Sequence, residues 1–170
     1  MAKPTQQPDI FHRHLSDSEA QECITFESNG LQARYFPRWV DHSVADRWYE
    51  ALMSSVNWSQ DEIIVYGKRH LTPRLSCWMG EPWMSYSYSQ HTMQPEPWQG
   101  CPREILQKLE ASHGDTFNSV LINLYRDGKD SNGWHADDEP ELGKRPVIAS
   151  VSLGAARDFY MRERQIIQTK

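Results

Sequence analysis

Residues 123–143 of the chain read NLYRDGKDSNGWHADDEPELG. Within this stretch a single residue, Ala136, separates His135 from Asp137. On an extended backbone alternate side chains point to the same face, so this imidazole and this carboxylate can bind one metal ion together. A second imidazole would complete the facial ligand set of non-haem Fe(II) oxygenases. Taken alone the triplet is weak evidence, because many His-x-Asp triplets are polar pairs at the surface or in turns.

The hydrophobic pattern on either side of this stretch predicts two helices and several short strands. The first helix opens at Ser43, and its apolar residues follow helical spacing from Ala45 to Val56. The second begins at Pro102, a suitable first-turn residue, and stops near Gly114. Strands are expected at residues 31–36, 63–66, 84–89, 119–125, 147–153 and 158–161. Because helices come early and strands dominate late, we expect an α+β domain built on an antiparallel sheet.

The length of 170 residues suits one domain, and 38% hydrophobic and 24% charged residues are typical of a chain that folds. Residues 1–28 are polar and are expected to form a mobile arm in front of a domain at 29–170. No apolar run is long enough to cross a bilayer and the start lacks a secretory signal, so we expect no membrane partner and a cytoplasmic location, or a nuclear one in a eukaryote. The three cysteines follow no metal-ligand spacing.

The charge pattern bears on partners. A net charge of -5 argues against coating nucleic acid through bulk electrostatics. A local basic groove remains compatible with it, since Lys68, Arg69, His70 and Arg74 form one dense basic cluster with aromatic residues on both sides.

The region from 119 to 162 closely resembles the AlkB family of nucleic-acid dioxygenases, in particular its members that repair duplex DNA. The resemblance rests on motifs that occur in the family's order and spacing. They are LINLY (121–125), DGKD (127–130), HADDE (135–139), PVIASVSLG (146–154) and RDF (157–159), with VYGK (65–68), PR (73–74) and YSYS (86–89) upstream. In total the resemblance covers residues 31–164.

The resemblance implies a double-stranded β-helix, or jelly roll, with the N-terminal helices packed on the sheet and a nucleotide-recognition hairpin region at about 60–92. It implies Fe(II) as cofactor, with 2-oxoglutarate and O2 as cosubstrates. His135 and Asp137 match the first two iron ligands and the centre of catalysis. Asn123 and Tyr125 match positions that hydrogen-bond a 2-oxoglutarate carboxylate; without the motif, an interior Asn and a core Tyr would be the simpler reading. The implied reaction hydroxylates an alkyl carbon on a base, and the resulting hemiaminal releases an aldehyde.

An enzyme that acts on a paired base must first flip it out of the duplex. The resemblance implies that Tyr86, with His135 opposite, sandwiches the flipped base. Tyr86 and Tyr88 alternate with serines, and the residues expected around the base are Tyr86, Ser87, Tyr88, Asp138 and Glu139.

Tyr66 matches the position at which a duplex-acting relative inserts an aromatic finger, although the family pattern has Phe there. Beside it, Gly67 is also expected to bind the substrate, and the basic residues Lys68, Arg69 and Arg74 would contact phosphates. The alternative is a solvated hairpin tip with ordinary surface charge. The expected partner is alkylated DNA, with RNA as the alternative, duplex or single-stranded, and the complete protein is expected to be a monomer.

The chain departs from the family at its end. No histidine follows His135, whereas the family has a distal His and then arginines that bind 2-oxoglutarate. Only 170 - 137 = 33 residues follow Asp137, so the last strands of the jelly roll are expected to be missing and the chain to be truncated. Two alternatives therefore stay open beside a demethylase: a non-catalytic nucleic-acid-binding remnant, and an unrelated small-molecule oxygenase or metal-free jelly-roll binding module.

Overall fold

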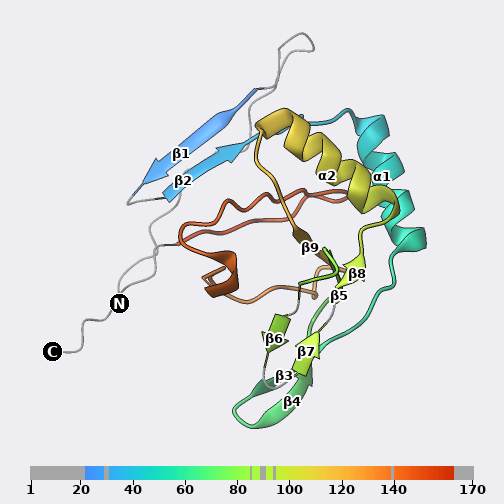
Figure 1. The fold of residues 1–170 in the computed structure, drawn as a ribbon, viewed down its shortest axis with the longest axis vertical. Coiled ribbons are helices and arrows are strands. Elements are labelled where there is room, and N and C mark those ends of the chain that lie inside the picture. Colours follow the sequence, from blue (N-terminus) through green and yellow to red (C-terminus); the bar gives the residue numbers. More distant parts are fainter. Residues whose placement is uncertain are drawn as a thin grey trace, which may run out of the picture. The chain divides into compact units, whose positions relative to one another are not determined.

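The computed structural model describes residues 22–28, 31–84, 86–88, 91–93, 95–138 and 140–162, and for 28, 65, 86–88, 91–93 and 141 it describes the backbone alone. The chain divides into two compact units, one at 42–156 and the other formed by residues before 42 and after 156. Helices and antiparallel strands are both present, so the α+β class is confirmed (Figure 1).

Two helices of equal length lie next to each other in the larger unit. They are α1, His42–Ser55, and α2, Gly100–His113. Trp48 of α1 is buried, and Arg47 of α1 forms a 2.7 Å ion pair with Glu104 of α2. The second helix ends where the sequence predicts, because Gly114 adopts the left-handed conformation (φ 77°) and its N–H bonds the carbonyl of Glu110. Among the described residues, no helix is both long and apolar enough to span a membrane.

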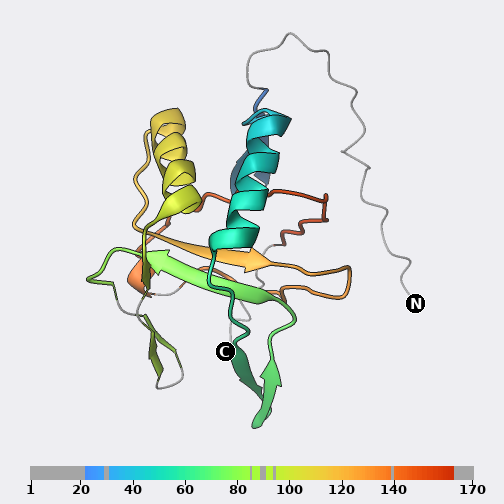
Figure 2. The ribbon, with the colours of Figure 1, turned by 90° about the vertical axis from the view of Figure 1, so that its right-hand side faces the viewer.

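The central sheet has three strands: β5 (Leu75–Gly80) in the middle, β9 (Ser119–Leu124) antiparallel to it, and the short β8 (Glu96–Pro97) parallel to it. Both helices lie on the same side of the β5–β9 pair (Figure 2). The core lies between them and consists of Val56, Cys77 and Met79, with Leu52, Trp58, Trp98, Val120 and Ile122 packed around. Apolar side chains from α1, β5 and β9 therefore fix the sheet beneath the helices.

Three two-stranded hairpins complete the described structure. In the larger unit, β3 (Glu62–Val65) pairs with β4 (Lys68–Leu71), and β6 (Tyr86–Tyr88) pairs with β7 (His91–Met93). In the smaller unit, β1 (Ile24–Ser28) pairs with β2 (Leu31–Tyr35). A short 3-10 turn, η1 (Pro140–Leu142), is the last element of the chain that the structure describes.

Two sequence expectations differ from the structure. The last residues of the expected arm form β1, in which the alternation of Ile24 and Phe26 with polar residues suits one half-buried strand face. Residues 147–153 and 158–161 are not strands. Their alternating pattern is typical of a strand, but a strand requires a hydrogen-bonded neighbour, and no backbone ladder includes them in the part of the chain described.

The core predicts a sharp contrast between two methionines. Met79 is 1% exposed, whereas Met53 on the outer side of α1 is 42% exposed. We expect Met79→Ala to lower the free energy of unfolding by about 2–5 kcal/mol, because it removes buried surface and leaves a cavity. Met53→Ala should change it by less than about 0.5 kcal/mol. Urea unfolding followed by circular dichroism measures both, and equal losses would contradict this core.

The thiols are expected to differ in reactivity. Burial, with a smaller contribution from Glu96, raises the pKa of Cys77 to about 11, and burial beside Glu104 raises the pKa of Cys101 to about 11. At pH 8 roughly one in a thousand of these thiols is ionised, and only the thiolate reacts. Iodoacetamide on the native protein should therefore label the exposed Cys23 first, as peptide mass spectrometry would show. Faster labelling of Cys77 than of Cys23 would refute the burial.

Candidate functional site

His135 and Asp137 lie in an irregular segment that follows β9. The imidazole Nε2 of His135 is 3.7 Å from Oδ1 of Asp137, so the two side chains face one another. The other ring nitrogen, Nδ1, is 2.8 Å from the carbonyl oxygen of Gly133. Both side chains are about half exposed and therefore accessible from solvent.

This arrangement suits a cation. A carbonyl oxygen only accepts hydrogen bonds, so Nδ1 must carry the proton. In the neutral ring Nε2 is then an acceptor, and it faces a carboxylate that is also an acceptor. A metal ion between the two would satisfy both, and an outer hydrogen bond from the far nitrogen is usual for a metal-bound His. The 3.7 Å separation of Nε2 and Oδ1 would let both atoms reach one ion after a small side-chain rotation.

The two residues therefore fit as one imidazole and one carboxylate ligand of iron. No third ligand joins them in the described part of the chain, where no group of three His, Cys, Asp or Glu side chains could hold a metal ion. The structure brings together the pair that the sequence predicts, and it adds no further ligand.

Asn123 lies in β9 opposite Ser76 of β5. Its Oδ1 accepts a 2.9 Å hydrogen bond from Nε of Arg74, the residue just before β5. The amide NH2 of Asn123 and the remaining guanidinium N–H groups are all donors, a combination that favours a carboxylate ligand. Tyr125 follows one residue after β9 and is half-buried.

This contact separates Arg74 from the other basic residues of its cluster. Lys68 and Arg69 lie on β4, whereas Arg74 is half-buried and hydrogen-bonded in the larger sheet. The sequence analysis grouped the three for phosphate binding because they are close along the chain. The Arg74 side chain is hydrogen-bonded to Asn123 of β9 and therefore does not belong to the β3–β4 hairpin that carries Lys68 and Arg69.

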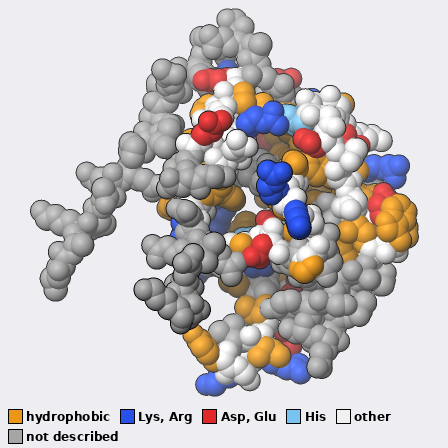
Figure 3. Space-filling model, turned by 60° about the vertical axis from the view of Figure 1, so that its left-hand side comes forward, with side chains coloured by type: hydrophobic (Ala, Val, Ile, Leu, Met, Phe, Trp, Pro, Cys, Tyr) orange, Lys and Arg blue, Asp and Glu red, His pale blue; other side chains and the backbone are white. Residues whose placement is uncertain are grey.

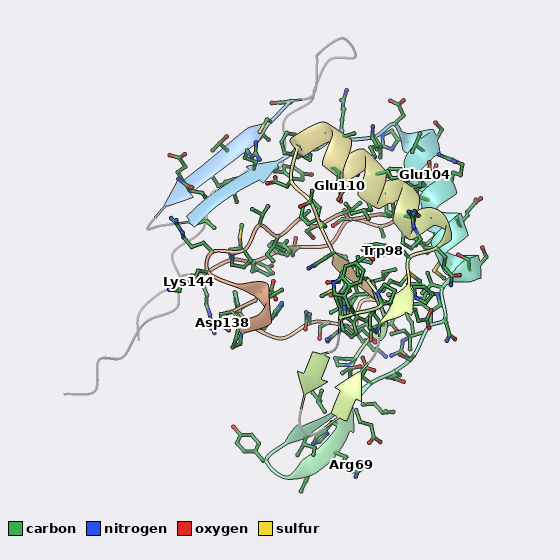
Figure 4. The ribbon with its side chains drawn as sticks, viewed as in Figure 1. Arg69, Trp98, Glu104, Glu110, Asp138 and Lys144 are labelled. Carbon is green, nitrogen blue, oxygen red and sulfur yellow. The ribbon has the colours of Figure 1, made fainter. Side chains whose placement is uncertain are left out.

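The β3–β4 hairpin carries Tyr66 and Gly67 at its tip, both with positive φ (50° and 74°). Positive φ at both central residues is typical of a two-residue type I′ turn, which matches the twist of the flanking strands. Tyr66 is fully exposed, and Lys68 is exposed. Arg69, labelled in Figure 4, pairs with Glu62 at 3.1 Å, an exposed contact worth little in stability.

The face in Figure 3 shows Lys and Arg side chains next to apolar ones at its lower end, where this hairpin lies. The exposed apolar residues there are Ile64, Tyr66 and Leu71. The β3–β4 hairpin therefore exposes apolar and basic side chains next to one another.

The stem of this hairpin is fixed by polar contacts. Ser76 donates a 2.5 Å hydrogen bond to Oδ2 of Asp61, and the N–H of Thr72 bonds the carbonyl of Asp61 at 2.8 Å. The side chain of Gln60 donates to the carbonyl of Thr72 at 2.7 Å. These bonds anchor the hairpin to β5, so its tip projects from a fixed base.

Four predicted site residues receive no side-chain placement. Tyr86, Ser87 and Tyr88 form β6, whose backbone alone is described, and Glu139 lies outside the described residues. Asp138 is described, exposed, and follows Asp137 directly in the loop before η1 (Figure 4). The sandwich of a base between Tyr86 and His135 thus remains a prediction.

Asp130, part of the DGKD motif, is a well-defined residue to which the sequence pattern assigned no role. Its carboxylate is buried and accepts hydrogen bonds from Nε, Nη2 and the backbone N–H of Arg126 at 2.7, 2.9 and 2.9 Å. These bonds raise the pKa of the Arg126 guanidinium above its usual value. An Arg and an Asp four residues apart around a Gly-containing turn were the available signal.

Comparison with known proteins gives consistent matches. The model of the 2OG-Fe(II) oxygenase superfamily matches residues 32–170. Alpha-ketoglutarate-dependent dioxygenase alkB homolog 3 of Homo sapiens is 45% identical over 150 residues, which are 87% of this chain and 52% of that protein. DNA oxidative demethylase ALKBH2 of Homo sapiens is 39% identical over 123 residues, 71% of this chain and 47% of that protein. The chain thus spans about half the length of these relatives.

Proposed function

The chain belongs to the 2OG-Fe(II) oxygenase superfamily and, within it, to the AlkB family, and on that basis we propose that the protein removes alkyl groups oxidatively from bases of DNA. The observation that carries this proposal is the facing pair His135–Asp137, with Nδ1 of His135 2.8 Å from the carbonyl oxygen of Gly133. The names of two groups of relatives, alkB homolog 3 dioxygenases and DNA oxidative demethylases, supply the reaction class.

For this function the expected fold is a double-stranded β-helix. Strands β5, β8 and β9 would form part of one of its sheets, with α1 and α2 packed on that sheet. The hairpins β3–β4 and β6–β7 would form the nucleotide-recognition region.

Iron would be held by Nε2 of His135 and an oxygen of Asp137. When bound with 2-oxoglutarate and O2, iron supplies the oxidation of the alkyl carbon. The chain's own contribution is orientation: the Gly133 carbonyl fixes the imidazole ring through Nδ1, and Asp137 places a negative charge beside Nε2.

The cosubstrate would lie beside Asn123 and Tyr125, with Arg74 as an additional donor. A 2-oxoglutarate carboxylate needs several N–H or O–H donors when it leaves water. The Arg74–Asn123 hydrogen bond holds the amide in one orientation, so that its NH2 group remains available. This contact favours a cosubstrate role for Arg74 over the phosphate role that the sequence analysis assigned.

The nucleic acid would meet the β3–β4 hairpin. The exposed tip, Tyr66 and Gly67, would fill the gap left by a flipped base, while Lys68 contacts phosphate. The base itself would lie among Tyr86, Ser87, Tyr88, Asp138 and Glu139. A basic, apolar hairpin explains how an acidic chain could bind DNA locally.

A second candidate function is nucleic-acid binding without turnover. The observation that favours it is the pair of metal ligands, which is one short of a complete facial set in the part of the chain described. Both functions share the hairpin, and turnover separates them.

The proposed reaction is tested with a 1-methyladenine oligonucleotide, Fe(II), 2-oxoglutarate and ascorbate, with mass-spectrometric detection of the restored adenine. The assay uses this chain and a chimera that adds the segment following the matched region in human alkB homolog 3. We expect turnover at least in the chimera. His135→Ala should lower it at least about a thousandfold, because it removes a metal ligand. Inactivity of both folded proteins would favour the binding function, and turnover retained in His135→Ala would refute the metal assignment.

The hairpin tip is tested by binding, independently of turnover. Tyr66→Ala should weaken binding to a duplex that contains one 1-methyladenine about tenfold, since stacking on an aromatic ring is worth about 1–3 kcal/mol. Binding to the single strand should change little, and Tyr66→Phe, which keeps the ring, should bind like the parent. Fluorescence anisotropy gives these affinities. Equal losses on duplex and single strand would count against insertion of the tip.

A further inference from the structure

The loop that carries the two metal ligands begins with a turn built by Asp127. Its Oδ1 accepts the backbone N–H of Lys129 at 2.8 Å and that of Asp130 at 3.3 Å. Such bonds from an Asp side chain to its own following backbone replace the regular hydrogen bonds of a helix or strand. The segment at 125–138 contains neither, so side-chain contacts must define its path.

Within this turn one carboxylate is buried. Asp130 is 6% exposed, whereas its neighbours at 126–129 and 131–138 are all exposed. Both of its oxygens bind the Arg126 guanidinium, and one also accepts the Arg126 backbone N–H. Charge-assisted bidentate pairs of this kind are stronger and more directional than neutral hydrogen bonds. These bonds join the two ends of the turn at residues 126–130.

The next residue connects that turn to the sheet. The backbone N–H of Ser131 donates a 2.8 Å hydrogen bond to the carbonyl of Pro73. Pro73 precedes Arg74, which holds Asn123. Two residues beyond Ser131, the Gly133 carbonyl bonds the His135 ring. Hydrogen bonds therefore occur at three successive points between Asp130 and His135.

From this series of contacts we infer that Asp130 is a positioning residue of the metal site. It binds neither metal nor substrate. By closing the turn it presents Ser131 to Pro73, and it thereby sets where His135 and Asp137 meet relative to Asn123. The inference rests on the proposed function. It also explains a buried charge in a loop that contributes nothing to the apolar core.

The test compares Mn(II) affinities, measured by electron paramagnetic resonance titration of the 170-residue chain. Asp130→Asn removes the charge and should raise the Mn(II) dissociation constant about tenfold, as loss of an outer partner of a metal ligand does. Asp127→Asn is the matched control. It changes the net charge equally in the same turn but keeps the Oδ1 acceptor, so its dissociation constant should equal the parent's.

A second measurement separates positioning from general stability. Hydrogen exchange of the backbone amides at 131–137, in metal-free protein, should accelerate in Asp130→Asn and not in Asp127→Asn, while exchange in β5 and β9 stays unchanged. If Asp130→Asn fails to fold, Arg126→Gln tests the same contact from its exposed partner.

Different results would refute the positioning role of Asp130 and the proposed metal site. If folded Asp130→Asn has the same Mn(II) dissociation constant and the same amide exchange rates as the parent, the positioning role of Asp130 is refuted. The proposed metal site would still stand in that case if His135→Ala abolishes Mn(II) binding. Equal Mn(II) binding by the parent and His135→Ala would refute the proposed metal site, and with it the positioning role. Accelerated exchange across the sheet as well would make Asp130 a general stabilising residue.

Discussion

The antiparallel pairing of β5 with β9 is the constraint on which the site depends. Its register runs from Leu75 opposite Leu124 to Gly80 opposite Ser119, and this order places the beginning of β5 beside the end of β9. Arg74 can therefore reach Asn123, and the loop that leaves β9 can reach Pro73. On the helix side of the same pair, Cys77 and Met79 form the core. The pairing of β5 with β9 thus positions both the apolar core and the residues of the candidate site.

Within the larger unit, the helix–sheet core and the segment that follows β9 are stabilised by different kinds of interaction. The helices and the sheet are joined by apolar contacts that need no particular direction. The segment 126–138 has exposed side chains almost throughout, and its path depends on directional bonds to Asp127, Asp130 and Pro73. A substitution in the core is therefore expected to act on the stability of the whole unit, whereas one in this segment is expected to act on the distance between His135 and Asp137.

Local patterns in the sequence predict local structure well. Helical spacing identified α1, and Gly114 marked the end of α2. The His-x-Asp spacing identified the facing pair His135 and Asp137. The sequence did not predict which distant segments pair with one another. Strand β5 was not predicted, and strands were expected at 147–153 and 158–161, where no ladder forms among the described residues. Arg74 was grouped with Lys68 because the two are close along the chain. Proximity along the chain does not show that Arg74 contacts Asn123 of β9.

The turn at Tyr66–Gly67 has a consequence for how such a hairpin can vary. An added Cβ at Gly67 would meet no atom within 4 Å, so space does not restrict this position and only the left-handed backbone does. Tyr66 is similarly unrestricted by neighbours. Inserting one residue within β3 or β4, however, would turn the side chains beyond it in that strand to the opposite face. Packing therefore leaves the side chains of this tip free to vary, whereas the pairing of its two strands fixes which face each strand residue occupies.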